Sequence, residues 1–174
     1  MSFANEKIII KQLDFRPKSK NHPFDCGNSD LNEYLLRYAW SNHNKGYAKV
    51  YIAVNPTKAS RNILGYYAIS AAALNIDALP ESLRKGQPKQ VPCVKIGRLA
   101  NAIAVRGKGI GRKLLFHALY QTVEISKMVG VSGVTADAKI ESIGFYEKYG
   151  FLRLEDSNSF FLPIETIKQG FEKS

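Results

Sequence analysis

The sequence predicts one mixed α/β (α+β) domain that covers residues 1–174. Residues 49–54 and 64–70 are segments of strand length, and the polar turn at 55–60 between them favours an antiparallel hairpin. Farther along, an apolar run at 96–105 leads into a glycine-rich stretch and then into apolar residues at helical spacing. A further strand follows this helix in the sequence, and the order strand, helix, strand is typical of a βαβ crossover. We therefore expect a mixed, strongly twisted central sheet flanked by helices.

Local patterns place the individual elements. Asn28, Ser29 and Asp30 are good capping residues ahead of apolar side chains at helical spacing, so a helix is expected to follow them. Three prolines make residues 77–92 an irregular segment with room for one helical turn. The remaining predicted elements, in chain order, are a strand at 8–13, the hairpin strands, the strand at 96–105, a long helix after the glycines, a strand at 131–136, a helix that Gly150 ends in a left-handed conformation, a strand around 160–162 and a tail helix from about 164.

Composition excludes several classes of protein. With 45% hydrophobic residues the chain is not globally disordered, and no apolar stretch approaches the length of a membrane span. The polar start, with a charged pair ahead of a short isoleucine run, predicts no signal peptide and a cytoplasmic protein. Cys26 and Cys93 lack metal-ligand spacing, so we expect no metal site; two free thiols are the simpler interpretation, and a disulfide remains open. His117 falls on the long helix and is expected to pack rather than catalyse.

The glycine-rich stretch at residues 106–111, Arg-Gly-Lys-Gly-Ile-Gly, is the most informative motif. Glycines at alternate positions let the backbone turn tightly and leave its N–H groups unshielded, and these donors meet at a helix N-terminus that favours negative charge. The motif therefore predicts a seat for a pyrophosphate. Its spacing excludes a Walker A loop, which needs a Gly-Lys-Ser/Thr tripeptide, and it does not fit the Gly-x-Gly-x-x-Gly dinucleotide fingerprint.

A second motif, Phe-Tyr-Glu-Lys-Tyr-Gly-Phe at residues 145–151, follows at a suitable separation. The first motif resembles the Arg/Gln-x-x-Gly-x-Gly/Ala acyl-CoA loop of the GNAT N-acetyltransferase superfamily, and the second resembles its last conserved block. The resemblance implies a GNAT-like domain with a splayed cofactor strand, acetyl-CoA as co-substrate, and Tyr146 near the cofactor sulfur as catalytic residue. The cofactor-binding residues that it implies are Leu99, Ala100, Asn101, Arg106, Gly107, Lys108, Gly109, Ile110, Gly111 and Arg112.

The N-terminal third narrows this resemblance. Phe24 to Leu35 is similar to the Phe-x-Cys-Gly…Leu…Tyr-Leu signature of small toxin-type GNAT proteins, and Gly-Tyr-Tyr at 65–67, Gly-Arg-Leu-Ala at 97–100 and Phe-Leu-Pro at 161–163 match as well. Such proteins acetylate the α-amine of aminoacyl-tRNA, block translation as type II toxins, and pair with a small ribbon-helix-helix antitoxin. The alternatives are a housekeeping GNAT that acetylates a small amine or a protein amine, and a degenerate GNAT without turnover. The intact glycine loop and Tyr146 argue against the last.

Two positions depart from the family pattern. Asn101-Ala102 stands where Val-Asp often follows Leu-Ala, which removes an acidic side chain but leaves the backbone groups that bind pantetheine. Lys139 stands where many GNAT proteins carry Asn or Asp near the cofactor, so that contact is in doubt.

The net charge of +10, from 25 Lys and Arg against 15 Asp and Glu, favours an anionic partner. A basic segment leads into the proposed cofactor strand and is expected to contact the phosphates of an acceptor. Its candidate substrate-binding residues are Arg84, Lys85, Lys89 and Arg98.

The chemistry requires attack of an amine on a thioester carbonyl. Backbone N–H groups of the splayed strand are expected to face the carbonyl oxygen, and Tyr146 is the best candidate to protonate the departing thiolate. No general base is evident, and Asp137 and Glu141 are weak candidates. The sequence leaves open the preferred tRNA or amino acid, the presence of an antitoxin, and whether the chain forms a homodimer.

Overall fold

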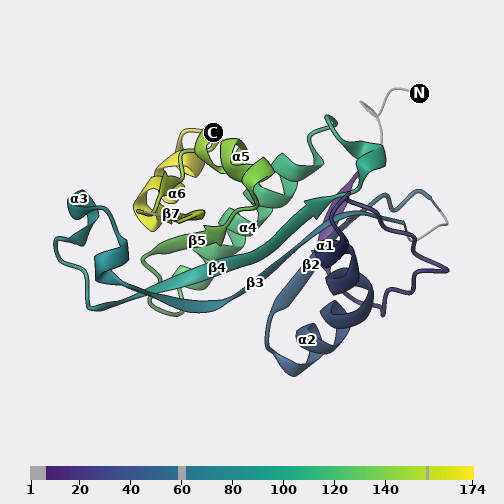
Figure 1. Cartoon of the computed structure of the whole chain (residues 1–174), viewed down its shortest axis with the longest axis horizontal. Coiled ribbons are helices and arrows are strands. Elements are labelled where there is room, and N and C mark those ends of the chain that lie inside the picture. The colour runs from purple at the N-terminus through teal and green to yellow at the C-terminus, as the bar shows by residue number, and fades with distance from the viewer. Residues whose placement is uncertain (1–6, 59–61, 156) are drawn as a thin grey trace. The chain divides into compact units, whose positions relative to one another are not determined.

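The computed structural model describes residues 7–58, 62–155 and 157–174, and Figure 1 shows the order of its elements. The strands are β1 (Ile9–Gln12), β2 (Lys49–Val54), β3 (Ile63–Asn75), β4 (Gln90–Asn101), β5 (Gly133–Asp137), β6 (Leu152–Arg153) and β7 (Ser159–Pro163). The α-helices are α1 (Ser29–Glu33), α2 (Ala39–Lys45), α3 (Glu81–Arg84), α4 (Ile110–Ser126), α5 (Ile143–Lys148) and α6 (Ile164–Glu172). A π-helix, η2 (Tyr34–Tyr38), joins α1 to α2, and short 3-10 turns are η3 (Ile76–Ala78), η4 (Ile103–Val105) and η5 (Ile140–Ser142).

The strands form one mixed sheet in the order β1-β2-β3-β4-β5-β7-β6. The β2–β3 hairpin is antiparallel and β4 pairs with β5 in parallel, so the predicted hairpin and βαβ crossover are both confirmed. By its internal contacts the chain divides into two compact units, one of Met1–Ile69 with Arg98–Ala118 and one of Ser70–Gly97 with Leu119–Ser174. The two units share β3, β4 and α4, each of which passes from one unit into the other.

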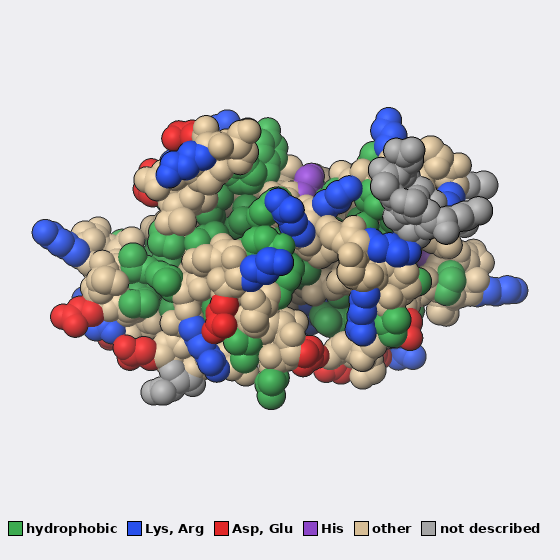
Figure 2. Space-filling view, turned by 90° about the horizontal axis from the view of Figure 1, so that it is seen from above, with side chains coloured by type: hydrophobic (Ala, Val, Ile, Leu, Met, Phe, Trp, Pro, Cys, Tyr) green, Lys and Arg blue, Asp and Glu red, His purple; other side chains and the backbone are tan. Residues whose placement is uncertain are grey.

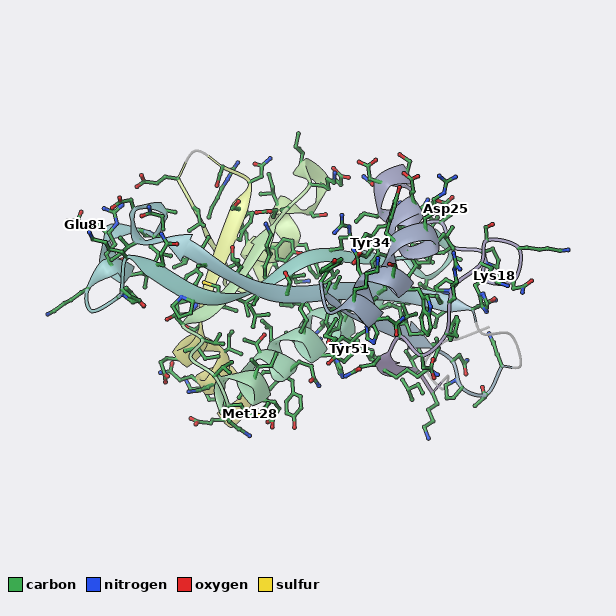
Figure 3. All side chains as sticks on the ribbon, turned by 90° about the horizontal axis from the view of Figure 1, so that it is seen from below. Lys18, Asp25, Tyr34, Tyr51, Glu81 and Met128 are labelled. Atoms are coloured by element: carbon green, nitrogen blue, oxygen red, sulfur yellow. The ribbon has the colours of Figure 1, made fainter. Side chains whose placement is uncertain are left out.

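The first unit has apolar side chains on both sides of β2 and β3. Successive strand residues point to opposite faces, so Tyr66 packs toward Tyr34 while Tyr67 packs toward Tyr51. Figure 3 shows Tyr34 and Tyr51 on opposite sides of these strands. The Tyr66 hydroxyl donates to the Leu31 carbonyl at 2.7 Å, which satisfies the polar end of a ring that is otherwise fully buried.

The second unit has its core where β5 and β7 pair. Phe160 and Phe161 of β7 are buried, and Phe161 packs in a cluster with Leu79, Val91 and Cys93. The helix α6 starts directly after β7, and the N–H of Ile164 donates to the Ser132 carbonyl at 2.9 Å. Gly150, with φ of 82°, follows α5 in the predicted left-handed conformation.

Most predicted elements are confirmed, and the differences have local causes. Asn28 caps α1 as expected, its side chain accepting from the Leu31 N–H. β3 extends to Asn75, beyond the predicted strand end at residue 70, and β4 starts at Gln90, so β4 replaces the end of the predicted irregular segment. The turn predicted at 55–60 is described only as far as residue 58, and its last two residues lie outside the described part of the chain.

Both cysteines are free, buried thiols, as the simpler interpretation predicted. His117 packs against the stacked rings of Tyr51 and Tyr67, with its Nδ1 2.7 Å from the Tyr67 hydroxyl, which confirms a packing role. Within the described segments, no helix is long and apolar enough to cross a membrane, and no group of side chains could hold a metal ion.

One buried histidine, His43, and one half-buried histidine, His117, predict a loss of stability in acid. Burial lowers the pKa of His117, and burial together with Lys49 lowers the pKa of His43, whose Nδ1 accepts from the Val50 N–H at 3.0 Å. Below a pH of about 6.5 the unfolded chain binds protons that the folded chain does not. The free energy of unfolding should therefore be constant above that pH and fall below it, by at most about 1.4 kcal/mol per pH unit for each histidine.

Urea unfolding at pH 8, 6.5 and 5 measures this loss. His43→Gln and His117→Gln, which do not titrate, should each flatten the dependence between pH 6.5 and 5. An unchanged slope in both variants would contradict the assignment.

Candidate active site

The glycine loop lies in the first unit, between η4 and α4. Gly107 and Gly109 have φ of 74° and 79°, a conformation that side chains other than glycine rarely adopt. Val105 before the loop and Ile110 after it are buried, with exposed fractions of 2% and 1%, while the loop between them is exposed. The loop is thus anchored at both ends and open in the middle.

Its open side can receive an anion. A Cβ built on Gly107 or Gly109 would meet no heavy atom within 4 Å. Among the described residues, the N–H groups of these two glycines donate to no backbone carbonyl. The first N–H groups of a helix also lack partners within it, and the 17-residue helix α4 begins at Ile110. These donors, together with the helix dipole and the exposed Lys108, make a site suited to phosphate oxygens.

The strand that leads to this loop has a free edge. The parallel pairing of β4 with β5 stops at Ile96, whereas β4 continues to Asn101. This confirms the splayed strand that was predicted. The backbone of Leu99, Ala100 and Asn101 therefore lies on an edge that β5 leaves unpaired. On the other side of β4, a Cβ on Gly65 would lie 2.8 Å from the Ala100 carbonyl, so glycine lets β3 approach closely.

Arg106, the first residue of the motif, has a partner that sequence reasoning missed. Its Nη2 donates to the Cys26 carbonyl at 2.7 Å, across 80 positions of sequence. Spacing alone gives no sign of this bond. The Phe-x-Cys-Gly signature is the signal that pointed to Cys26 and Gly27, and the structure places it against the glycine loop within the first unit.

Tyr146 lies on α5 in the second unit. Its ring is buried, with 4% exposed, and stacks on Phe160 with centroids 5.7 Å apart. Helix geometry alone did not require Tyr146 to join a core; the edge-on contact with Phe151 and the stack on Phe160 place it there. Burial, with Asp137 as a second cause, raises the pKa of Tyr146, which keeps the hydroxyl protonated and able to donate.

Asp137, a weak candidate for a general base, is already engaged. One of its oxygens lies 2.6 Å from Lys95 Nζ, and the other accepts from the Ser159 hydroxyl at 2.7 Å. These partners outweigh burial and lower the pKa of the Asp137 carboxyl, which makes it a poor proton acceptor. Glu141 is exposed on η5, as expected for a solvated side chain.

The basic side chains that were predicted to bind substrate differ in their contacts and exposure. Arg84 donates to the carbonyls of Leu79 and Asp77, at 2.8 and 3.1 Å, so it holds its own loop together. Lys85 and Lys89 are exposed. Arg98, in the first unit, rests its guanidinium 3.7 Å from the centre of the Tyr34 ring. Of the four predicted substrate-binding residues, Arg84 is therefore the least available to a ligand.

The charge excess is carried at the surface. No Lys or Arg side chain is buried in the part of the chain that the structure describes. Figure 2 shows such side chains dispersed over one face. The surface can therefore attract an anionic partner, although its charge does not identify that partner.

The family model described as "Acetyltransferase (GNAT) domain" matches residues 82–161. The chain is 26% identical over 129 residues to a tRNA-acetylating toxin of Mycobacterium tuberculosis, an alignment that covers 74% of this chain and 75% of the relative. Among solved structures, AtaT complexed with acetyl-methionyl-tRNAfMet has a TM-score of 0.86 and 30% identity, covering 95% of this chain and 99% of that one. A Tyr-to-Phe mutant of AtaT bound to the C-terminus of the antitoxin AtaR and to acetyl-CoA has a TM-score of 0.78 and 27% identity, covering 94% and 98%.

Proposed function

Because the chain belongs to the GNAT acetyltransferase superfamily, we propose that it transfers the acetyl group of acetyl-CoA to the α-amine of an aminoacyl-tRNA. The observation that carries this proposal is the likeness to AtaT over 95% of the chain, since that protein was solved with acetyl-methionyl-tRNAfMet. The matched family region contains both the glycine loop and Tyr146. We propose that residues 1–174 work as one N-acetyltransferase domain, because both compact units contribute to it.

The first unit has the features that acetyl-CoA binding requires. Bound acetyl-CoA supplies an acetyl group activated as a thioester. The open N–H donors around Gly107 and Gly109 would hold its pyrophosphate, with Lys108 and Arg112 adding positive charge. The free edge at Leu99, Ala100 and Asn101 would bind the pantetheine through backbone groups. N–H groups of this edge would also stabilise negative charge that develops on the carbonyl oxygen.

Proton transfer is assigned to Tyr146. The Tyr146 hydroxyl carries its proton at neutral pH, as a phenol with a raised pKa does, and we propose that Tyr146 Oη gives this proton to the departing sulfur. The acceptor amine does not need a general base to remove its proton. An α-amine has a pKa of about 8, so a useful fraction is uncharged near neutral pH. The engagement of Asp137 by Lys95 and Ser159 is consistent with a reaction that does not depend on it.

Three observations support charged tRNA over another acceptor. Relatives at 26 to 30% identity are a tRNA-acetylating toxin and AtaT. The chain carries a net charge of +10. Exposed Lys85 and Lys89 are available for phosphates. The alternative is a housekeeping GNAT that acetylates a small amine or a protein amine, which would need neither the charge nor these lysines.

Partners and location follow from this proposal. AtaT binds the C-terminus of its antitoxin AtaR, and we propose an antitoxin of the ribbon-helix-helix class for this chain. We also propose a cytoplasmic location, because charged tRNA is used there.

Substituting Gly109 with aspartate tests the cofactor site. The change places a carboxylate beside the proposed phosphate donors and adds backbone strain at a φ of 79°. Wild-type protein should be stabilised by acetyl-CoA, by about 2.7 kcal/mol at 100 times the Kd. Gly109→Asp should lose this stabilisation in a thermal shift assay. Gly144→Asp, exposed on α5 with no atom within 4 Å of its Cβ, is the control. An undiminished shift in Gly109→Asp would contradict the site.

Tyr146→Phe tests the proton donor. Because Tyr146→Phe removes only the hydroxyl and keeps the ring that stacks on Phe160, the variant should keep its stability and its affinity for acetyl-CoA. Its kcat should fall by a factor on the order of 10²–10⁴. The matched variant Tyr66→Phe removes a hydroxyl that donates to the Leu31 carbonyl, and it should lose about 1 kcal/mol of stability instead. An unchanged kcat in Tyr146→Phe would make this residue structural.

Reversing charge at Lys85 and Lys89 tests the acceptor. The apparent KM for charged tRNA should rise steeply with salt, since phosphate contacts release counterions. Lys85→Glu/Lys89→Glu should raise this KM and leave the Kd of acetyl-CoA unchanged. The pair Lys18→Glu/Lys20→Glu, exposed and equal in charge change, is the control for net charge. Equal effects of the two pairs would remove Lys85 and Lys89 from the acceptor site.

A further inference from the structure

The start of the glycine loop is tied to a turn near the N-terminus. The Arg106 guanidinium donates to the Cys26 carbonyl at 2.7 Å, and the Ile103 N–H donates to the Asp25 carbonyl at 2.9 Å. The two acceptors are consecutive carbonyls, so the bonds fix both the position and the direction of the segment that enters the loop. All four residues belong to the first unit.

The turn at residues 24–28 is itself held firmly. Asp25 Oδ1 accepts from the Gly27 N–H at 2.8 Å and from the Asn32 side chain at 3.0 Å. Asn32 also accepts from the Cys26 N–H at 2.9 Å. The Gly27 and Asn32 bonds, and then the nearby Arg106, lower the pKa of the Asp25 carboxyl. Phe24 and Cys26 are buried in the core, and Figure 3 labels Asp25 near α1.

Gly27 is the residue that lets Arg106 reach this turn. It has a φ of 80°, and a Cβ built on it would lie 2.9 Å from Arg106 Nη2. Any side chain would therefore displace the guanidinium from the Cys26 carbonyl. Gly46, at the end of α2, has nearly the same φ, 78°, but nothing lies within 4 Å of its Cβ. The two glycines share a backbone constraint and differ in the Arg106 contact.

We propose that the turn at residues 24–28 is a brace that holds the glycine loop in its ligand-binding conformation before the cofactor arrives, with Arg106 as the positioning residue that connects them. A loop rich in glycine loses more conformational freedom on ordering than any other. Fixing it in advance removes part of that loss from the binding step and raises affinity. The toxin-type Phe-x-Cys-Gly signature is then part of the cofactor site. This inference rests on the proposed use of acetyl-CoA.

Amide hydrogen exchange of the ligand-free protein tests the brace directly. The informative amides are Ile103, Arg106 and Lys108, which donate within the turn and the loop entry. Gly27→Ala and Arg106→Ala should each accelerate their exchange. Gly46→Ala should leave it at the wild-type rate, although it carries the same backbone strain.

Calorimetric titration with acetyl-CoA gives the second readout. Gly27→Ala and Arg106→Ala should each weaken binding about tenfold, the factor expected for one hydrogen bond to a charged group. The double variant should bind no more weakly than Arg106→Ala alone, because both changes remove the same contact. Gly46→Ala should bind like wild type.

The results that would contradict the brace differ from the result that would contradict the proposed cofactor. Unchanged exchange in the ligand-free variants, with weakened binding, would make Arg106 a direct phosphate ligand and overturn the brace. Equal effects of Gly27→Ala and Gly46→Ala would attribute the loss to backbone strain and overturn it as well. Failure of the wild-type protein to bind acetyl-CoA would refute the proposed cofactor, while the exchange measurement would still decide whether the turn orders the loop.

Discussion

The left-handed backbone at Gly107 and Gly109 is the constraint on which the cofactor site depends. It turns N–H groups toward solvent at the start of α4, where a helix dipole already favours negative charge. Such a loop is costly to order, and the fold offsets this by burying Val105 and Ile110 on either side of it. The bonds from Ile103 and Arg106 to the turn at residues 24–28 add a third fixed point. In the arrangement that we propose, residues that do not face the ligand add to cofactor affinity by ordering the loop whose N–H groups bind it.

In the mechanism that we propose, the two compact units supply different parts of the chemistry. The first holds the anion seat and the free edge of β4, and the second holds Tyr146 in an aromatic environment that keeps its hydroxyl protonated. Asp137, which the sequence offered as a weak candidate for a general base, forms an ion pair with Lys95 and a hydrogen bond with Ser159. Such a distribution suits an acceptor whose amine is already partly uncharged at neutral pH, and an α-amine meets that condition.

The sequence predicted the features that depend on local rules. The cap at Asn28, the hairpin, the left-handed Gly150 and the order strand, loop, helix all follow from residue type and spacing, and the structure confirms them. The sequence could not predict features that depend on tertiary contacts. The π-helix at Tyr34–Tyr38, the local bonds of Arg84 and the reach of Arg106 to Cys26 have no periodicity to reveal them. The burial of Tyr146 likewise depends on Phe160, which arrives from a strand later in the chain.

We propose that the acetyl group goes to the amino acid carried by tRNA. Incubation of the protein with radiolabelled acetyl-CoA and total charged tRNA, in the presence of free polyamines and peptides as competitors, tests it most directly. The expected result is label on the tRNA fraction, released by mild alkali as N-acetyl amino acid, with the competitors unlabelled. Label on a polyamine or a peptide, with none on charged tRNA, would contradict the claim and identify a GNAT enzyme that acts on a small or protein amine.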